Sequence, residues 1–185
     1  MNVESTVSTL SASRSDLRSL IEFQSILNRI STKFINLPSG EIDAGIDEAL
    51  ETIGQFMNVD RSYVFQFSGD KKTMSCTHEW CAEEVSPEIE QLQNVSVETF
   101  AWSNQILLSG RILHIPDVAD LPPEAAFERQ EFQRQDIQSL LTVPMIYLGE
   151  TVGFLGFDAV REQKHWSRDS RMLLRNVGDI FVNAL

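Results

Sequence analysis

Two cysteines and three histidines are the residues of this chain that could do metal or redox chemistry. Cys76, His78 and Cys81 lie together in the stretch TMSCTHEWC, whereas His114 and His165 lie far from it in the sequence. A metal or haem site needs several ligands that converge. On an extended strand Cys76 and His78 would share one face and offer two ligands, which is not a closed site. We therefore expect no metal and no haem, and a half-buried His78 with one hydrogen bond.

The two thiols are poor candidates for redox catalysis. Cys76 and Cys81 are five residues apart in one predicted strand, so their side chains should point to opposite faces and not form a disulfide. A reactive thiol needs a lowered pKa, and the neighbouring acids Glu79, Glu83 and Glu84 act in the opposite direction. We expect inert core cysteines in a reducing compartment.

No catalytic motif is present either. The segment Gly-Phe-Leu-Gly-Phe (Gly153–Phe157) is not a phosphate loop, because no Lys-Ser/Thr follows it and it reads as a strand. There is no HExxH, no nucleophile elbow and no Ser/Cys-His pair at a suitable spacing. We expect no catalytic residue. Gly153 and Gly156 fit the close approach of a neighbouring group, or, for Gly156, room for a ligand.

Composition and charge limit the partners. The 185 residues are 42% hydrophobic and 23% charged, with 11 Phe, as expected for one globular domain with a packed core. The formal net charge of −12, without a basic cluster, argues against nucleic acid. Neither a secretory signal nor a run of ~20 apolar residues occurs, so we expect a cytoplasmic chain without membrane insertion.

Helical periodicity marks both ends of the chain. The first 13 residues are Ser/Thr-rich and have no period, which indicates a disordered arm, and residues 14–185 then form a single domain. Apolar residues recur every three or four positions from Leu17 to Phe34, from Ile42 to Met57 and from Leu173 to Leu185. Ser167 is a suitable N-cap for the last helix. That helix ends without a C-cap glycine, which suggests that it continues in a longer protein.

The period changes to two in the middle of the chain. The segments RSYVFQF and TMSCTHEWC alternate around the turn SGDKK and predict an antiparallel hairpin, and SLLTVPMIY and ETVGFLGFDAV predict a second one. Residues 82–136 are irregular, with two short helices and the short strand RILHI. The predicted fold class is therefore α+β: a central antiparallel sheet with helices segregated on its faces. The strand SLLTVPMIY is apolar on both sides, so it should be covered on both faces.

With this order of elements the sequence resembles a GAF domain, the small-molecule sensing module found beside histidine kinases, cyclases and phosphodiesterases. The segments that carry the resemblance are EALETIGQFMNVDRSYVFQF, THEWCAEEVSP, DIQSLLTVPMIYLGETVGFLGFDAV and HWSRDSRMLLRNVGDIFVNAL, and together they cover most of the chain after Leu20. The resemblance implies that the N- and C-terminal helices pack on one face of the sheet. It also implies a pocket between the other face and a lid of short helices and loops, which the irregular middle segment supplies. It does not identify a ligand.

Two ligand classes of the family can be tested by residue. Bilin-binding members attach the chromophore to a Cys followed by His in the lid helix, and the corresponding segment EFQRQDIQSLL has neither. Cyclic-nucleotide-binding members carry a dispersed Asn-Lys-Phe-Asp-Glu set, of which only Phe157-Asp158 can be placed here. The cofactor therefore stays unknown, and covalent bilin and haem are disfavoured.

Aromatic residues and polar tips of the lid and strands are the candidate ligand contacts, since small-molecule sites combine apolar walls with a few polar groups. The candidates are Thr77, Glu79, Trp80, Phe100, Trp102, Asp117, Arg134 and Gly156. Each aromatic residue alone also fits an ordinary core position. Which face of each strand meets the lid stays open, because both faces are apolar.

The sequence thus predicts a non-enzymatic sensory domain of a bacterial signalling protein, such as a histidine kinase or a cyclic-di-GMP enzyme, whose output domain lies outside this chain. It would bind an unidentified small molecule and form a homodimer through its terminal helices. The alternative is a ligand-free GAF domain that serves as a dimerisation or docking scaffold. A pocket filled by Trp80, Phe100 and Trp102 would favour that alternative.

Overall fold

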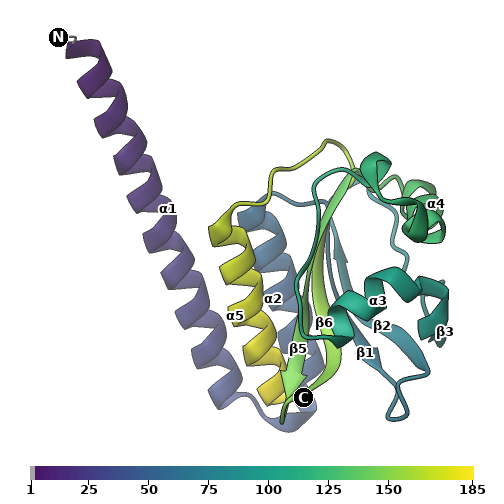
Figure 1. The fold of residues 1–185 in the computed structure, drawn as a ribbon. Coiled ribbons are helices and arrows are strands. Elements are labelled where there is room, and N and C mark those ends of the chain that lie inside the picture. Colours follow the sequence, from purple (N-terminus) through teal and green to yellow (C-terminus); the bar gives the residue numbers. More distant parts are fainter. Residues whose placement is uncertain (1–2) are drawn as a thin grey trace.

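One curled sheet of six antiparallel strands organises the domain (Figure 1). The computed structural model describes residues 3–185, and their side chains from Arg18 onward except Ser19. The strands are β1 (Arg61–Phe67), β2 (Thr73–Cys81), β3 (Val95–Ser96), β4 (Leu113–Ile115), β5 (Ser139–Tyr147) and β6 (Glu150–Ala159). Their order across the sheet is β3-β2-β1-β6-β5-β4, so the predicted hairpins β1–β2 and β5–β6 meet through the central pair β1–β6.

Helices cover the two faces in separate groups. Figure 1 places α1 (Val3–Asn36), α2 (Ile42–Met57) and α5 (Arg168–Ala184) on one face, here called the helix side. The other face, the lid side, carries α3 (Ala101–Leu108), α4 (Ala126–Arg134) and short 3-10 turns, all within residues 82–135, here called the lid. This arrangement confirms the predicted α+β class and the assignment of layers. No helix in the described part of the chain is long and apolar enough to cross a membrane.

Capping and turn residues determine where the helices and strands end. Ser167 caps α5 as predicted, because its side-chain oxygen accepts a hydrogen bond from the Ser170 amide at 3.1 Å. Helix α2 ends at Asn58, which adopts the left-handed conformation that asparagine tolerates. Leu148 and Gly149 both have positive φ, 49° and 84°, which gives β5 and β6 the tight turn that the sequence predicts.

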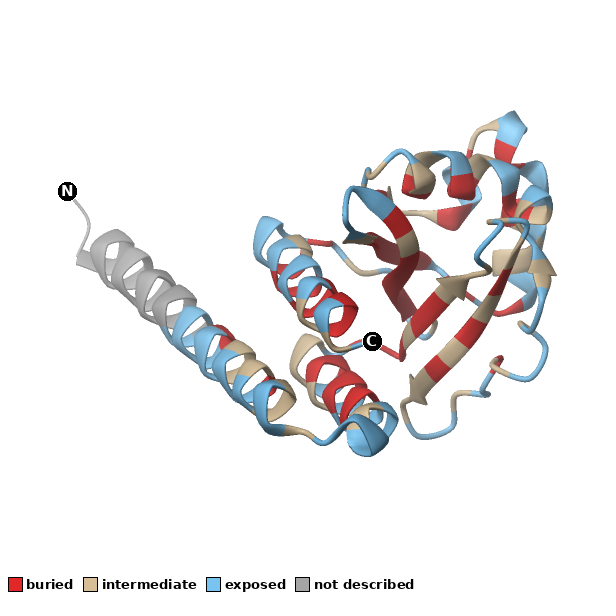
Figure 2. Cartoon of the chain, turned by 90° about the horizontal axis from the view of Figure 1, so that it is seen from below, coloured by how far each residue is buried: buried red, intermediate tan, exposed pale blue. Residues whose placement is uncertain are grey.

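Alternation along β5 separates two cores. Leu141, Val143 and Met145 belong to a helix-side core that also contains Ile46, Leu50, Leu155, Phe157, Trp166, Leu173, Leu174 and Phe181. Leu140 belongs instead to a lid-side core with Phe65, Cys76, Phe100, Leu107, Leu113 and Phe154. Figure 2 shows buried residues on both faces of the sheet. The prediction that β5 is covered on both sides is confirmed.

A β-bulge corrects the predicted faces of β2. Val64 pairs with His78 while the next residue, Phe65, pairs with Cys76, so Thr77 is an extra residue on β2. One extra residue reverses the alternation. Cys76 therefore lies in the lid-side core while His78 contacts Asp43 of α2, with Nε2 3.4 Å from Oδ1. The prediction that Cys76 and His78 share a face was wrong, and the five-residue spacing of Cys76 and Cys81 does not place them on opposite faces.

Two further elements differ from the sequence pattern. Helix α1 begins at Val3, so residues 3–13, predicted to be a disordered arm, are part of a helix, while residues 1–2 lie outside the described residues. Extending an existing helix costs little once its first turn has formed, so a segment without an apolar stripe can continue it. The two-residue strand β3 was not predicted, because its pairing with Thr73 and Met74 is set by tertiary contact.

Candidate functional site

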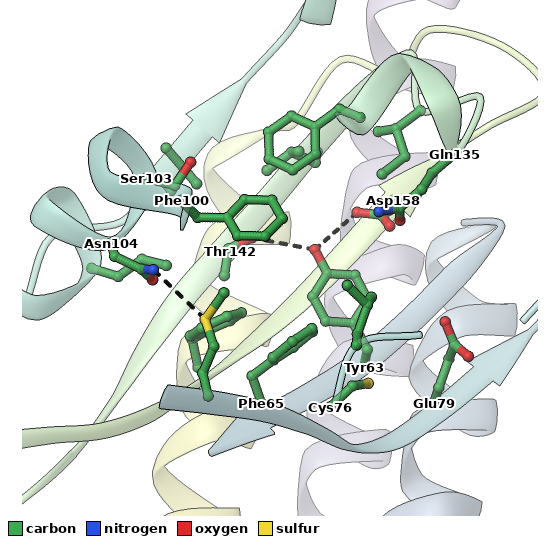
Figure 3. Close-up of a pocket in the computed structure, with 18 residues that line it drawn as sticks. Tyr63, Phe65, Cys76, Glu79, Phe100, Ser103, Asn104, Gln135, Thr142 and Asp158 are labelled. Atoms are coloured by element: carbon green, nitrogen blue, oxygen red, sulfur yellow. Dashed lines mark hydrogen bonds between the residues drawn. The ribbon is translucent and has the colours of Figure 1, made fainter. Parts of the chain in front are cut away.

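A cavity of about 70 Å³ lies between the lid side of the sheet and the lid (Figure 3). Strands β1, β2, β5 and β6 form its floor, and α3, β4 and the end of α4 form its walls. The apolar lining consists of Phe65, Met74, Leu92, Phe100, Leu107, Leu113, Phe132, Ile137, Leu140 and Phe154. The polar lining consists of Tyr63, Cys76, Glu79, Ser103, Asn104, Gln135, Thr142 and Asp158. Apolar walls with a limited number of polar groups are typical of small-molecule sites.

Aromatic rings occupy much of the floor. Phe65 and Phe154, from neighbouring strands, stack with ring centroids 4.7 Å apart. The ring of Tyr63 meets Phe65 edge to face at 5.7 Å. Residues at i and i+2 on one strand share a face, which explains how Tyr63 and Phe65 of RSYVFQF come together here. The rings leave the Tyr63 hydroxyl as the polar group at the centre of the floor.

A buried polar network begins at that hydroxyl. Tyr63 donates a hydrogen bond to Asp158 Oδ1 at 2.9 Å, and its oxygen lies 3.5 Å from Thr142 Oγ1 (Figure 3). The other Asp158 oxygen, Oδ2, lies 3.7 Å from Arg61 Nη1, and the side chains of Arg61 and Asp158 are each only 4% exposed. A charge is costly to bury unless it is paired and hydrogen-bonded. Asp158 meets that requirement through Tyr63 and Arg61, whereas Arg61 Nη1 is paired by charge but makes no hydrogen bond among the described residues.

Burial changes the proton affinity of this network. It raises the pKa of the Asp158 carboxyl from 3.8 to about 7, although Arg61 and the Tyr63 hydroxyl both favour the ionised form. Burial, together with the charge of Asp158, also raises the pKa of Tyr63 well above its ordinary value. Asp158 can therefore gain or lose a proton near neutral pH, while Tyr63 stays a hydrogen-bond donor.

Helix α3 contributes two buried polar side chains. The Asn104 amide nitrogen donates to Val97 O at 2.9 Å and contacts Met74 Sδ at 3.6 Å. The Ser103 side-chain oxygen is buried and has no hydrogen-bond partner among the described residues. The start of α3 is held by Glu128 of α4, whose Oε1 accepts from the backbone amides of Trp102 and Ser103. A buried carboxylate at a helix N-terminus satisfies the free amides and suits the helix dipole.

Two charged side chains, Glu79 and Arg61, fasten the lid to the sheet, and a third, Arg134, joins two parts of the lid. Glu79 of β2 accepts hydrogen bonds from the backbone amides of Glu88 and Ile89, at 2.9 and 3.0 Å. Arg134 of α4 pairs with Glu88 at 2.7 Å and also with Glu131. Arg61 donates to two lid carbonyls, those of Ser86 and Gln135, at 3.1 and 3.3 Å. Arg61 thus connects the Asp158 carboxylate in the floor with both sides of the lid.

Two of the residues predicted as ligand contacts line the cavity, and two others, Gly156 and Arg134, do not. Glu79 and Phe100 line it, although the Glu79 carboxylate is occupied by lid amides. Gly156 pairs with Tyr63 in the sheet, and a Cβ there would overlap the ring of Tyr63, so Gly156 makes room for that tyrosine. Arg134 is half exposed on the outside of the lid, where it holds Glu88 and Glu131.

The other four predicted contacts lie elsewhere. Trp80 packs on the helix side over Gly54 of α2, because the bulge at Thr77 turns it away from the lid. Thr77 is that bulged residue and donates to Val64 O. Trp102 packs against the lid-side core without lining the cavity. Asp117 caps a 3-10 turn by accepting from the Ala119 amide at 2.8 Å.

Residues that the sequence did not single out form most of the polar lining, namely Tyr63, Ser103, Asn104, Gln135, Thr142 and Asp158. One feature of the sequence could have identified two of these residues. Thr142 and Asp158 interrupt strands that are otherwise apolar on both faces, and a polar residue in a buried strand needs a partner. The strand pattern could have marked each of them as a candidate. Their common contact with Tyr63 depends on the sheet, in which Tyr63 and Thr142 both pair with Gly156 and Asp158 lies two residues beyond Gly156.

The cysteines and histidines do not form a metal-binding group among the described residues. Both cysteines are free thiols. Burial, with a smaller contribution from Glu79, raises the pKa of Cys81 to about 11 and that of Cys76 still further. High thiol pKa values disfavour the reactive thiolate, in agreement with the expectation of inert cysteines.

Solved structures with the same fold come from different kinds of protein. The phycocyanobilin-bound GAF domain of a cyanobacterial phytochrome matches with a TM-score of 0.73 and 18% identity, over 88% of this chain and 92% of that one. The GAF domain of a phosphoenolpyruvate-protein phosphotransferase from Coxiella burnetii matches with a TM-score of 0.69 and 15% identity, over the same shares of the two chains. At these identities the likeness concerns the fold.

Sequence comparison connects the chain with signal transduction. It is 28% identical over 152 residues to the methanogenesis regulatory histidine kinase FilI of Methanothrix harundinacea (strain 6Ac). The aligned part is 78% of this chain and 17% of the kinase, so the chain spans about a sixth of that relative. The GAF domain model matches residues 41–185, which is most of the chain and includes the whole sheet and the cavity. The chain therefore belongs to the GAF domain family.

Proposed function

We propose that this domain is a sensory module that binds a small molecule in the cavity between its sheet and its lid. The observation that carries the proposal is the polar network of Tyr63, Asp158 and Arg61, which is buried at the floor of an otherwise apolar cavity. Buried charged groups are expensive for a fold to keep, and they concentrate at functional sites. If this space had only a structural role, apolar side chains would be sufficient to fill it.

The size of the cavity limits the ligand. At about 70 Å³ it lies well below the roughly 300–1,000 Å³ of pockets for drug-sized molecules. A tetrapyrrole or a cyclic nucleotide would require the lid to move outward. The lid helix α4, AFERQEFQR, also lacks the Cys-His pair to which bilin-binding members attach their chromophore. A ligand of a few heavy atoms fits the structure best.

The lid offers a route from the cavity to the rest of a signalling protein. Arg61 joins Asp158 to the lid carbonyls of Ser86 and Gln135, so a ligand that changes the hydrogen bonds of Asp158 also changes how the lid is held. The helix-side core packs β5 and β6 directly against α5, and α1 packs on α5. We propose that α1 and α5 carry the change to an output domain such as a histidine kinase or a diguanylate cyclase.

The same helices are the proposed dimer contact. Exposed apolar side chains lie on α1 and α5, namely Leu20, Ile21, Ile35 and Met172, with Ile35 78% exposed. Such residues gain from burial against a second copy. Sedimentation velocity should give a dimer, and charged substitutions at Ile21 and Ile35 should shift the protein towards monomer. A monomer at high micromolar concentration would count against this contact.

A second candidate function, a scaffold without ligand, is favoured by one observation. The domain's own rings of Phe65, Phe100 and Phe154 already fill much of the space under the lid. In that case the Tyr63–Asp158 pair would only specify the packing of the lid.

Native mass spectrometry of the purified domain, beside its denatured mass and its absorption spectrum, separates the two candidates. A retained small molecule supports the sensor. A bare protein that no small molecule stabilises in a thermal-shift screen supports the scaffold, because any ligand that binds only the folded state must raise its stability.

A further inference from the structure

We propose that the cavity selects a small uncharged or cationic molecule that donates hydrogen bonds, and that it rejects anions of the same size. This inference rests on the proposed function, because it names the chemical class of the ligand. The inference rests on hydrogen-bond acceptors that lie beside aromatic rings in the cavity lining. The nearest cation, Arg61, is already paired with Asp158.

The first step is the hydrogen-bonding capacity that the lining residues retain. The Asn104 amide nitrogen is held by Val97 O and Met74 Sδ, which leaves the amide oxygen as an acceptor. The side-chain nitrogen of Gln135 donates one hydrogen bond to Glu131 at 3.0 Å, so its amide oxygen and one N–H remain. Asp158 has acceptor sites beyond the one that Tyr63 occupies. The polar groups of the lining can therefore accept hydrogen bonds from donors on a ligand.

The second step is the charge around the cavity. None of the described residues that line it is Lys, Arg or His, whereas two of them, Glu79 and Asp158, are acids. Arg61 lies behind Asp158, and its charge is paired with that carboxyl group. It donates hydrogen bonds to Ser86 O and Gln135 O, while its Nη1 makes no hydrogen bond among the described residues. Arg134 pairs with Glu88 and Glu131 on the outer side of the lid. An anion would enter this site without a free cation to compensate its lost hydration.

The third step is an unsatisfied group. Ser103 is only 5% exposed, lines the cavity, and its side-chain oxygen has no hydrogen-bond partner among the described residues. A buried hydroxyl without a partner costs free energy, so such a group calls for a reason. A ligand that bonds to Ser103 would remove this cost, and the hydroxyl can accept from the ligand like the other groups.

The aromatic lining determines which non-hydrogen-bonding part the ligand can have. Its rings are those of Tyr63, Phe65, Phe100, Phe132 and Phe154. They favour a short apolar frame, and the negative faces of aromatic rings also attract ammonium groups. The two forms of ligand that combine these features are a small neutral amide or alcohol and a small alkylammonium. Both donate hydrogen bonds to acceptors, and the experiment distinguishes them.

Three probes of nearly equal size test the proposal: propionamide, propylammonium and propionate. Each is titrated into the isotopically labelled domain, and chemical-shift changes at the backbone amides of Ser103, Asn104 and Asp158 report entry into the cavity. We expect propionamide, propylammonium or both to bind, and propionate to bind at least tenfold more weakly than the better of them. Which donor binds more tightly tells whether the natural ligand is neutral or cationic.

Two variants tie the binding to the site. Ser103→Ala should weaken the better probe about fivefold, the effect of losing one hydrogen bond of about 1 kcal/mol. Ser109→Ala is the matched control, because Ser109 is exposed just beyond the end of α3 and bonds only to Ile106 O and Arg111. It should leave the affinity unchanged.

Three results would overturn the inference. Propionate binding as tightly as the two donors would show that Arg61 turns from Asp158 towards the cavity, and the proposed function would survive. An anionic molecule retained in native mass spectrometry would do the same. If none of the three probes enters the cavity and no natural ligand is retained, the inference and the proposed sensory function fail together.

Discussion

The two faces of the sheet are built from the same strands but are packed differently. On the helix side, Leu141, Val143, Leu155 and Phe157 are completely buried against α2 and α5. On the lid side, alternate residues of the same strands include Thr142 and Asp158, and they surround a cavity. Dense apolar packing gives stability, whereas incomplete packing with buried polar groups lowers it. The difference indicates that the helix side provides most of the stability of the fold, and it supports the binding role proposed for the lid side.

The largest expected effect comes from a matched pair of truncations on the two faces. Leu155→Ala should lower the free energy of unfolding by about 4 kcal/mol, because Leu155 is fully enclosed in the helix-side core. Leu140→Ala should cost only about 2 kcal/mol, because Leu140 already borders the cavity and loses fewer contacts. Urea unfolding measures both. Equal losses would remove the distinction between the two faces.

The next effect concerns pH and the buried acid of the lid side. The folded pKa of Asp158, about 7, lies above its ordinary value of 3.8, so its contribution to stability is complete below pH 3.8 and is lost as the pH rises through 7. The stability of the wild type relative to Asp158→Asn should therefore fall by about 4 kcal/mol between these pH values, because each unit of the pKa difference corresponds to about 1.4 kcal/mol. Urea unfolding of both proteins across this pH range measures it. A constant difference would mean that Asp158 is ionised throughout.

A smaller effect compares two glycines that lie under aromatic rings on opposite faces. A Cβ at Gly156 would overlap the ring of Tyr63, and a Cβ at Gly54 would overlap that of Trp80. Gly156→Ala should cost about 2 kcal/mol and disturb the Tyr63–Asp158 hydrogen bond, because Tyr63 is enclosed between sheet and lid. Gly54→Ala should be nearly neutral in thermal unfolding, because Trp80 lies at the edge of the sheet and alanine favours the helix by about 1 kcal/mol.

The smallest effect is local and concerns the lid. Glu79→Gln removes the charge from the carboxylate that accepts hydrogen bonds from the Glu88 and Ile89 amides. Losing charge assistance in these bonds should lower the local opening free energy by about 1 kcal/mol. Hydrogen exchange at those two amides should become roughly fivefold faster. Glu150→Gln is the control, since Glu150 pairs only with the exposed Lys71 at the far end of the sheet. Equal exchange in both variants would show that Glu79 does not hold the lid.

The sequence by itself determined the elements, their layers and the family. Periods of 3.6 and 2 follow from backbone geometry, so the three long helices and both hairpins could be read from the spacing of apolar residues such as those of Ile42–Met57 and Ser139–Tyr147. Strand β5 showed that both faces of the sheet are covered. The helix cap at Ser167 and the turn at Leu148–Gly149 depend on neighbouring residues in the chain, so they could also be predicted from the sequence.

The tertiary structure alone decided which residues form the site. One extra residue in β2, Thr77, reversed the alternation, placed Trp80 on the helix side and separated Cys76 from His78. Glu79 and Arg134 were predicted as ligand contacts but their charges hold the lid. Tyr63 and Asp158, 95 positions apart, meet only because β1 pairs with β6. A cavity is made by contacts between distant segments, and neither the periodicity of one strand nor the type of one residue encodes them.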